Sequence, residues 1–184
     1  DSNACPTVIL ANNGTNVDVS NNDCWYFSST GATISSTDHQ TFVYGQSATE
    51  MSEITVTDDL VPTITDANDL RIVIATTSVN MRWDTTDTTA VFGGSASGKV
   101  ENPVSYLGDG EILVISVTSD FGTQDTLTIS GLSYKDFNTV NSAVSAIGVR
   151  TAGAGTSTIN IDSKTVTIKG TLAIGEHSQG QVID

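Results

Sequence analysis

Apolar and polar residues alternate with a period of two over many short stretches of this 184-residue chain. In the stretch 70–74, Leu70, Ile72 and Ile74 fall on one side, and Arg71 and Val73 fall on the other. Successive side chains of a strand point to opposite faces of its sheet, so one face of this strand is predicted to be core. No stretch shows a sustained apolar repeat of 3.6 residues. The pattern predicts an all-β protein.

Turn signals separate the alternating stretches, as expected for antiparallel hairpins. They are Gly93-Gly94, Gly108-Asp109-Gly110 and Asp162-Ser163. The predicted strands are 7–11, 16–20, 24–28, 41–44, 53–57, 70–75, 90–92, 104–106, 111–118, 126–130, 146–150, 157–161, 165–169 and 171–174. The pattern weakens at 134–145, and one helical turn there or at 81–86 would be compatible with it. So many short strands favour an antiparallel β-sandwich, immunoglobulin-like or jelly-roll-like, because one open sheet would leave an apolar face in water.

Composition shifts near 36–38 and again in the Gly/Ala-rich segment 151–155. These shifts divide the chain into three predicted parts: an N-terminal arm (1–38), a β-sandwich module (39–150) and C-terminal strands that complete or extend the sandwich (151–184).

The chain carries 21 Asp and Glu but only 7 Lys and Arg, a formal net charge of −14. Such a charge repels phosphate backbones and anionic lipid headgroups, so we expect no nucleic-acid partner. No apolar run approaches the roughly 18 residues that span a bilayer, so membrane insertion is not expected either. The electrostatic field of this negative charge attracts cations instead, and outside the cell the abundant divalent cation is calcium.

Both cysteines, Cys5 and Cys24, lie near the start of the chain, on either side of an Asn-rich segment. The first residues, Asp1-Ser2-Asn3-Ala4, do not resemble a cytosolic start, which indicates that a signal peptide has been removed and that the protein is extracellular. We therefore expect a disulfide between Cys5 and Cys24, which would stabilise the fold by roughly 3 kcal/mol in the chain-entropy model. Two free thiols are the alternative.

Residues 39–150 resemble the cohesin-like or immunoglobulin-like sandwich modules of secreted bacterial surface proteins. The segments that carry the resemblance are Ile64-Thr65-Asp66-Ala67-Asn68-Asp69-Leu70-Arg71-Ile72, Met81-Arg82-Trp83-Asp84-Thr85-Thr86-Asp87-Thr88-Thr89-Ala90, Gly93-Gly94-Ser95-Ala96 and Leu127-Thr128-Ile129-Ser130-Gly131-Leu132. The resemblance implies a surface-exposed structural or adhesive role, and it brings no catalytic residues with it.

Carboxylates and amides gather in three places that would suit calcium, which prefers six to eight oxygen ligands. The adjacent pair Asp58-Asp59 is one of them. The favoured ligands are Asp66, Asn68 and Asp69 in a second segment, and Asp84 and Asp87 in a third. Asp and Asn also close turns and cap helical turns. A purely structural role for these residues is therefore the alternative to metal binding. No other cofactor is expected.

Catalytic signatures are missing from the sequence. His39 and His177 are the only histidines, and neither lies in a recognisable triad context. We therefore do not expect an enzyme. Trp25 and Trp83 could line a sugar platform, although a core role is the stronger interpretation.

An apolar run at the N-terminus suggests how the protein works. Thr7, Val8, Ile9, Leu10 and Ala11 form a short β segment that precedes the sandwich module. We expect this segment to pair with an adjacent subunit by β-strand addition, which makes the chain a subunit of a pilus-like surface filament whose partners are copies of itself. The alternative is a monomeric carbohydrate-binding or cohesin-type adhesion module with glycans as partners.

Overall fold

The computed structural model describes residues 9–10, 25–26, 31–144, 146–154 and 157–171. Within them the protein is almost entirely β, with one short 3-10 helix, η1 (Ser97–Lys99). The strands are β1 (Ile9–Leu10), β2 (Trp25–Tyr26), β3 (Thr33–Ser36), β4 (Gln40–Val43), β5 (Thr49–Glu50), β6 (Ile54–Thr57), β7 (Leu70–Ile74), β8 (Arg82–Trp83), β9 (Val91–Gly93), β10 (Val100–Leu107), β11 (Ile112–Val117), β12 (Thr126–Ser130), β13 (Ser133–Lys135), β14 (Asn141–Val144), β15 (Ile147–Arg150), β16 (Asn160–Ile161) and β17 (Thr165–Lys169). The predicted all-β sandwich is confirmed.

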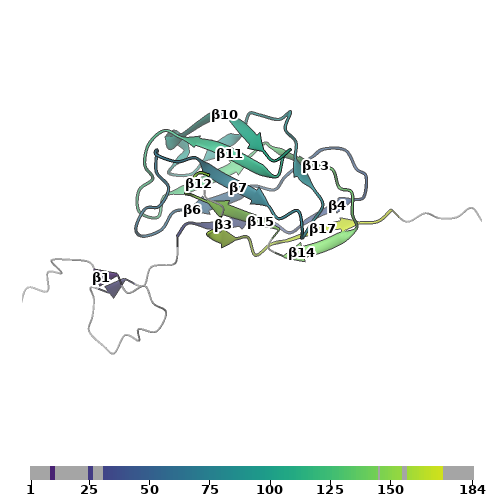
Figure 1. Cartoon of the computed structure of the whole chain (residues 1–184), viewed down its shortest axis with the longest axis horizontal. Coiled ribbons are helices and arrows are strands. Elements are labelled where there is room, and N and C mark those ends of the chain that lie inside the picture. Colours follow the sequence, from purple (N-terminus) through teal and green to yellow (C-terminus); the bar gives the residue numbers. More distant parts are fainter. Residues whose placement is uncertain (1–8, 11–24, 27–30, 145, 155–156, 172–184) are drawn as a thin grey trace, which may run out of the picture.

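One layer of the sandwich is an antiparallel sheet in the order β10, β11, β7, β15, β16. Strand β14 leads into β15 and β16 leads into β17, so the smaller sheet β14, β17, β4 extends this layer (Figure 1). In the smaller sheet β17 pairs antiparallel with β14 and parallel with β4. Strands from the two ends of the sandwich therefore lie side by side.

The other layer consists of β3, β6, β12 and β9, continued by β5, β13 and β8. The two parts belong together because β5 runs into β6 and β12 runs into β13. The N–H of Met51 donates to the carbonyl of Leu132 at 2.9 Å across the junction. Between β3 and β4 the chain crosses from this layer to the first.

Alternating side chains from both layers meet in one core. Leu70, Ile72 and Ile74 of β7 are buried as the pattern predicted, and Leu127 and Ile129 of β12 are buried opposite them. Aromatic rings close one end of this core: Phe42 stacks on Phe137 at 4.4 Å between ring centroids, and Trp83 lies 4.7 Å from Tyr134.

The predicted hairpin turn at Gly108-Asp109-Gly110 is confirmed and joins β10 to β11. All three residues have positive φ, and a Cβ on Gly110 would lie 2.6 Å from the carbonyl oxygen of Trp83. Glycine is required there because the turn packs against β8, whose Trp83 N–H donates to the Gly110 carbonyl at 2.8 Å.

A helical turn forms neither at 81–86 nor among the described residues of 134–145. Strands β8, β13 and β14 occupy these segments instead. Strand β3 is an addition that the pattern did not predict, because the buried position 36 is a serine. β3 lies before the predicted boundary at residue 38 and pairs with β6, and β17 lies after the predicted boundary at residue 150 and pairs with β4. The sandwich therefore includes strands from all three predicted parts of the chain.

Candidate functional site: the strand edges of the sandwich

The edges of the two layers decide where another chain could add a strand, because an unpaired edge presents free N–H and C=O groups. On one side the edges are tied together by Asn102 of β10. Its side chain accepts from the Ala90 N–H at 3.0 Å and donates to the Ala90 carbonyl at 2.9 Å. The Val104 N–H also donates to the carbonyl of Thr88 at 2.9 Å. These bonds occupy part of the β10 edge and the peptide groups that precede β9.

On the opposite side Asp162 joins the two layers. Its buried carboxylate accepts from the N–H of Ser36 on β3 at 3.1 Å and from the N–H of Lys164 at 3.0 Å. One negative charge thus holds the edge of β3 beside the segment between β16 and β17. Burial and the nearby Asp162 charge raise the pKa of the Tyr134 phenol.

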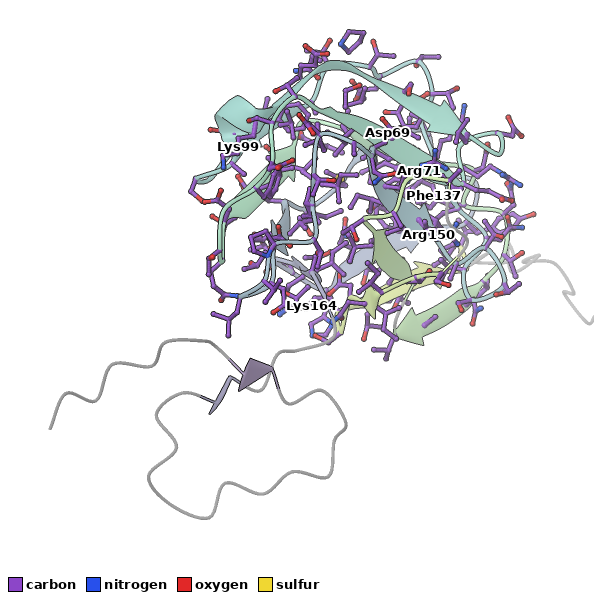
Figure 2. All side chains as sticks on the ribbon, turned by 60° about the vertical axis from the view of Figure 1, so that its left-hand side comes forward. Asp69, Arg71, Lys99, Phe137, Arg150 and Lys164 are labelled. Atoms are coloured by element: carbon purple, nitrogen blue, oxygen red, sulfur yellow. The ribbon has the colours of Figure 1, made fainter. Side chains whose placement is uncertain are left out.

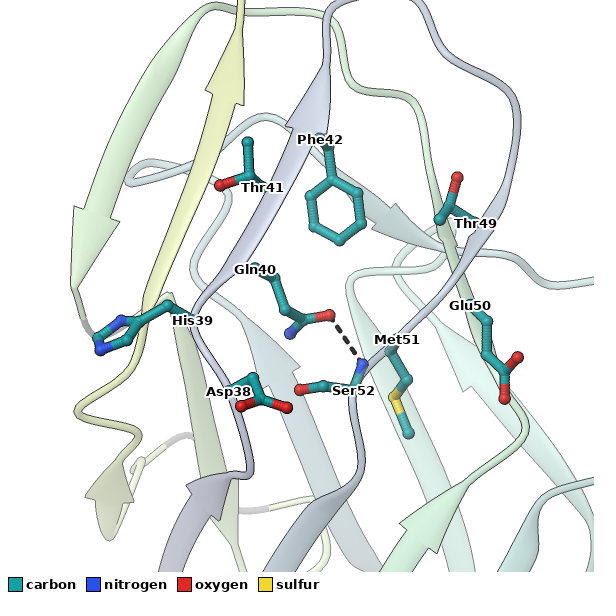
Figure 3. A pocket seen from close by; sticks show the side chains of 9 residues that line it. All are labelled: Asp38, His39, Gln40, Thr41, Phe42, Thr49, Glu50, Met51 and Ser52. Atoms are coloured by element: carbon teal, nitrogen blue, oxygen red, sulfur yellow. Dashed lines mark hydrogen bonds between the residues drawn. The ribbon is translucent and has the colours of Figure 1, made fainter.

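A groove of about 360 Å³ opens between β4 and β5, where the two layers separate (Figure 3). Phe42 and Met51 are buried at its sides, and the Ser52 N–H donates to Gln40 Oε1 across it at 2.9 Å. The free edge of β4 is capped by Gln46, whose Oε1 accepts from the Val43 N–H at 2.5 Å and whose N–H donates to the Val43 carbonyl at 3.0 Å. Little of this edge remains available to another strand.

The groove also contains Asp38, His39 and Ser52, but they do not form a nucleophile–base relay. His39 lies toward β17 in Figure 3, and its Nδ1 accepts from the Thr165 N–H at 2.8 Å. A catalytic histidine would use its ring nitrogens for the serine and the aspartate. His39 instead stabilises the junction of β4 and β17.

Among the predicted cation ligands, Asp84 closes a turn. Its Oδ1 accepts from the N–H and hydroxyl of Thr86 at 3.1 and 2.9 Å, and the Lys135 ammonium lies 3.7 Å away. The Thr86 hydrogen bonds, assisted by Lys135, hold the pKa of Asp84 below its usual value. Asp87 accepts from the Ser133 hydroxyl at 3.4 Å. In this structure Asp84 therefore closes a turn, as the alternative interpretation expected.

The segment with Asp66, Asn68 and Asp69 is also engaged locally. The Asp66 N–H donates to Asp120 Oδ1 at 3.0 Å, the Asn68 N–H donates to the Thr65 carbonyl at 3.2 Å, and Asp69 lies 3.6 Å from the guanidinium of Arg71 (Figure 2). In the described part of the chain no three His, Cys, Asp or Glu side chains gather as metal ligands would. Calcium binding stays a prediction.

Asp58, which belongs to one of the predicted cation-ligand clusters, has a structural role. Its buried carboxylate accepts from the Asp59 and Thr63 N–H groups at 2.8 and 2.9 Å, from the Thr63 hydroxyl at 2.8 Å, and from the Ile64 N–H at 3.1 Å. It thereby shapes the whole connection between β6 and β7. The Thr five residues after an Asp was the available signal, but such spacings are common in loops.

The predicted subunit-contact segment lies only partly within the described residues. Ile9 and Leu10 form β1, which pairs parallel with β2 and with no strand of the sandwich (Figure 1). Thr7, Val8 and Ala11 fall outside the described residues, as do Cys5 and Cys24, so the disulfide stays a prediction.

Trp83 is fully buried, so it cannot serve as a sugar platform. No described helix is long and apolar enough to cross a membrane. Comparison with models of known families, with curated proteins and with solved structures gave no match.

Proposed function

We propose that this protein is an extracellular structural subunit that polymerises into a surface filament by β-strand addition between copies. The donor is the segment formed by Thr7, Val8, Ile9, Leu10 and Ala11, and it pairs with a strand edge of a neighbouring copy. The resemblance to secreted sandwich modules and an extracellular location are part of this proposal.

The observation that carries the proposal is the separation of β1 from the sandwich. Strands β3 to β17 pair among themselves in two layers, whereas β1 pairs with β2 alone. Ile9 and Leu10, the described residues of the apolar run, therefore add no strand to the described sandwich. An apolar β segment with this placement suits addition to another copy.

The free energy gained at such a contact is of the same order as the cost of association. Five added residues form about five backbone hydrogen bonds worth roughly 0.5–1.5 kcal/mol net each. Burial of two or three aliphatic side chains contributes roughly 1.5–3 kcal/mol apiece. These terms oppose the entropy lost on association, and a polymer repeats the contact at every joint.

Deleting residues 1–11 tests the donor. We expect the shortened chain to fold with the circular dichroism of the full chain, because its sandwich begins at β3, and to remain monomeric in negative-stain micrographs where the full chain forms fibres. Ile9→Asp should block assembly in the same way, since it places a charge in the paired segment. Asn12→Asp, which adds the same charge outside the segment, is the matched control and should assemble. Normal fibres from the shortened chain would exclude this donor, and isolated particles of the full chain would favour the monomeric adhesion module.

A further inference from the structure

The outer edge of β14 differs from the other edges of the sandwich. Among the described strands, β17 is the only partner of β14. The Tyr44 N–H donates to the Lys169 carbonyl at 2.7 Å, which turns the peptide groups of Thr165, Thr167 and Lys169 toward β4. Those of Val166 and Ile168 consequently face β14.

The register of β14 on β17 then determines which of its groups are free. Ala143 lies opposite Val166 and Asn141 opposite Ile168, so the peptide groups of these two residues point to β17. Those of Ser142 and Val144 point outward. The Ser142 N–H is satisfied by Asn141 Oδ1 at 2.8 Å, which leaves the Val144 peptide facing outward.

This edge lacks charges and prolines, since the segment 138–144 contains neither. The segment 78–80 contacts its beginning, where the Asn138 N–H donates to the Asn80 carbonyl at 3.2 Å and the Asn141 side chain donates to the Ser78 carbonyl. Asn102, Asp162 and Gln46 protect other edges, as described above. Natural sheets protect exposed edges with charges, prolines or covering segments, and an edge without them pairs readily with another strand.

The face of the small sheet beside this edge is free of acids, and its residues are mostly Thr and Val. Its outer face consists of Thr41, Val43, Ser142, Val144, Thr165, Thr167 and Lys169, identified by register and by their exposure. The Ser142 and Thr167 hydroxyls lie 2.8 Å apart, which places them on one side of the sheet. Val140 and Val144 are 59% and 57% exposed, and Val140 lies beside Gly170 at the end of β17.

Charge identifies the occupant of this surface. A second copy of the chain carries a net charge of −14, so most of the molecule repels it. The outer face contains no carboxylate and includes Lys169, and Lys164 precedes β17 (Figure 2). An acidic copy meets the least repulsion here, beside an uncharged edge.

We propose that the outer edge of β14 accepts the donor segment 7–11 of a second copy, whose body then lies against the outer face. The inference rests on the proposed function and names the acceptor of the same assembly. The donor residues Val8, Ile9 and Leu10 are uncharged, as is the edge that they join.

Three full-length variants test the acceptor. Val144→Lys places a charge on the edge, and Val144→Pro removes the outward N–H while leaving the hydrogen bonds to β17 intact. Val91→Lys is the matched control, because Val91 is 61% exposed and lies on β9, away from this sheet. We expect both Val144 variants to fold and to raise the critical concentration for fibre formation by at least about tenfold, equivalent to about 1.4 kcal/mol. The Val91 variant should assemble as the parent chain does.

Hydrogen exchange of the unmodified chain provides a second measurement that needs no variant. The Val144 amide should exchange rapidly in monomers and slowly in fibres. Fibres from the Val144 variants at the normal critical concentration, or an unprotected Val144 amide in fibres, would overturn the acceptor while leaving the donor segment in place. A chain without residues 172–184 can be compared with the chain without residues 1–11. If only the first loses the protection of the Val144 amide, the segment 172–184 is the occupant, and the proposal that segment 7–11 binds here is overturned. A full chain that never forms fibres would exclude the proposed function itself.

Discussion

Three aspartate carboxylates act as hydrogen-bond acceptors for the backbone at points where the chain changes direction. Asp58 organises the connection from β6 to β7, Asp162 ties β3 to the end of β16, and Asp125 closes the turn before β12. In a chain with 21 acidic residues, some of this charge therefore has a structural role. Each of these carboxylates must stay ionised to accept its full set of bonds.

The clearest case for a pH effect is Asp125. Its carboxylate accepts from the Lys99 ammonium at 2.9 Å, the Gly122 N–H at 2.7 Å and the Ser95 hydroxyl at 2.8 Å. The hydrogen bond from Lys99, followed by those from Gly122 and Ser95, lowers the pKa of Asp125 from 3.8 to about 2. A lowered pKa in the folded state adds stability above the unfolded pKa, and this stability is lost as the pH falls through the folded value.

We therefore expect Asp125→Asn to lower the urea midpoint at pH 6 and to have a much smaller effect at pH 2. The gap between variant and parent should close between about pH 4 and pH 2, the window between the two pKa values. Asp66→Asn, which neutralises an exposed carboxylate, is the control. An equal gap at both pH values would show that Asp125 stabilises the turn by shape and not by charge.

At the scale of elements, hydrophobic alternation predicts strands well only where the buried positions are aliphatic. β7 and β12 were predicted for this reason, since Leu70, Ile72, Leu127 and Ile129 fill their core positions. In contrast, β3 buries Ser36, and the segment 141–144 of β14 is mostly small and exposed. These two strands form because they pair with neighbouring strands, and their own sequences carry little strand signal.

Which strands pair with each other is harder to predict from local sequence than where the strands lie. The parallel pairing of β4 with β17 joins segments at opposite ends of the sandwich, and no local pattern records it. The acidic segments were predicted as places of interest, but the choice between calcium and turn closure depends on which N–H groups face each carboxylate. For Asp84 those groups belong to Thr86, two residues later.

Removing the Asp58 carboxylate should show how much this residue stabilises the connection between β6 and β7. We expect Asp58→Ala to lower the free energy of unfolding by about 2–4 kcal/mol, because several buried donors lose a charged acceptor. Asp58→Asn keeps one acceptor oxygen and should cost less. Asp66→Ala should change the stability by no more than about 0.5 kcal/mol, as is usual for an exposed side chain. Chemical denaturation of the three variants measures these differences, and a small effect of Asp58→Ala would show that the loop is held by other contacts.

At the scale of the whole molecule, charge and edge protection point to the same surface. Side chains bond to backbone groups at edges on both sides of the sandwich, and the net charge of −14 opposes the approach of copies. The outer edge of β14, with its acid-free outer face, is the place where both barriers are low. An assembly through this surface must still bring two strongly acidic bodies close together, so its free energy contains a repulsive term that salt screens.

Fibre formation should consequently become easier as salt is added. The screening length falls from about 30 Å at 0.01 M to about 10 Å at 0.1 M, which is shorter than the width of the sandwich. We expect the critical concentration of the full chain, measured by sedimentation, to fall as NaCl rises over this range. Lys169→Glu should steepen the dependence because it places a carboxylate on the outer face. Lys135→Glu changes the net charge equally but lies on β13. Because it removes a partly buried pair with Asp84 at 3.7 Å, circular dichroism must first show that this variant folds. A long-range effect of total charge would shift both variants alike, whereas contact through the outer face shifts the Lys169 variant more.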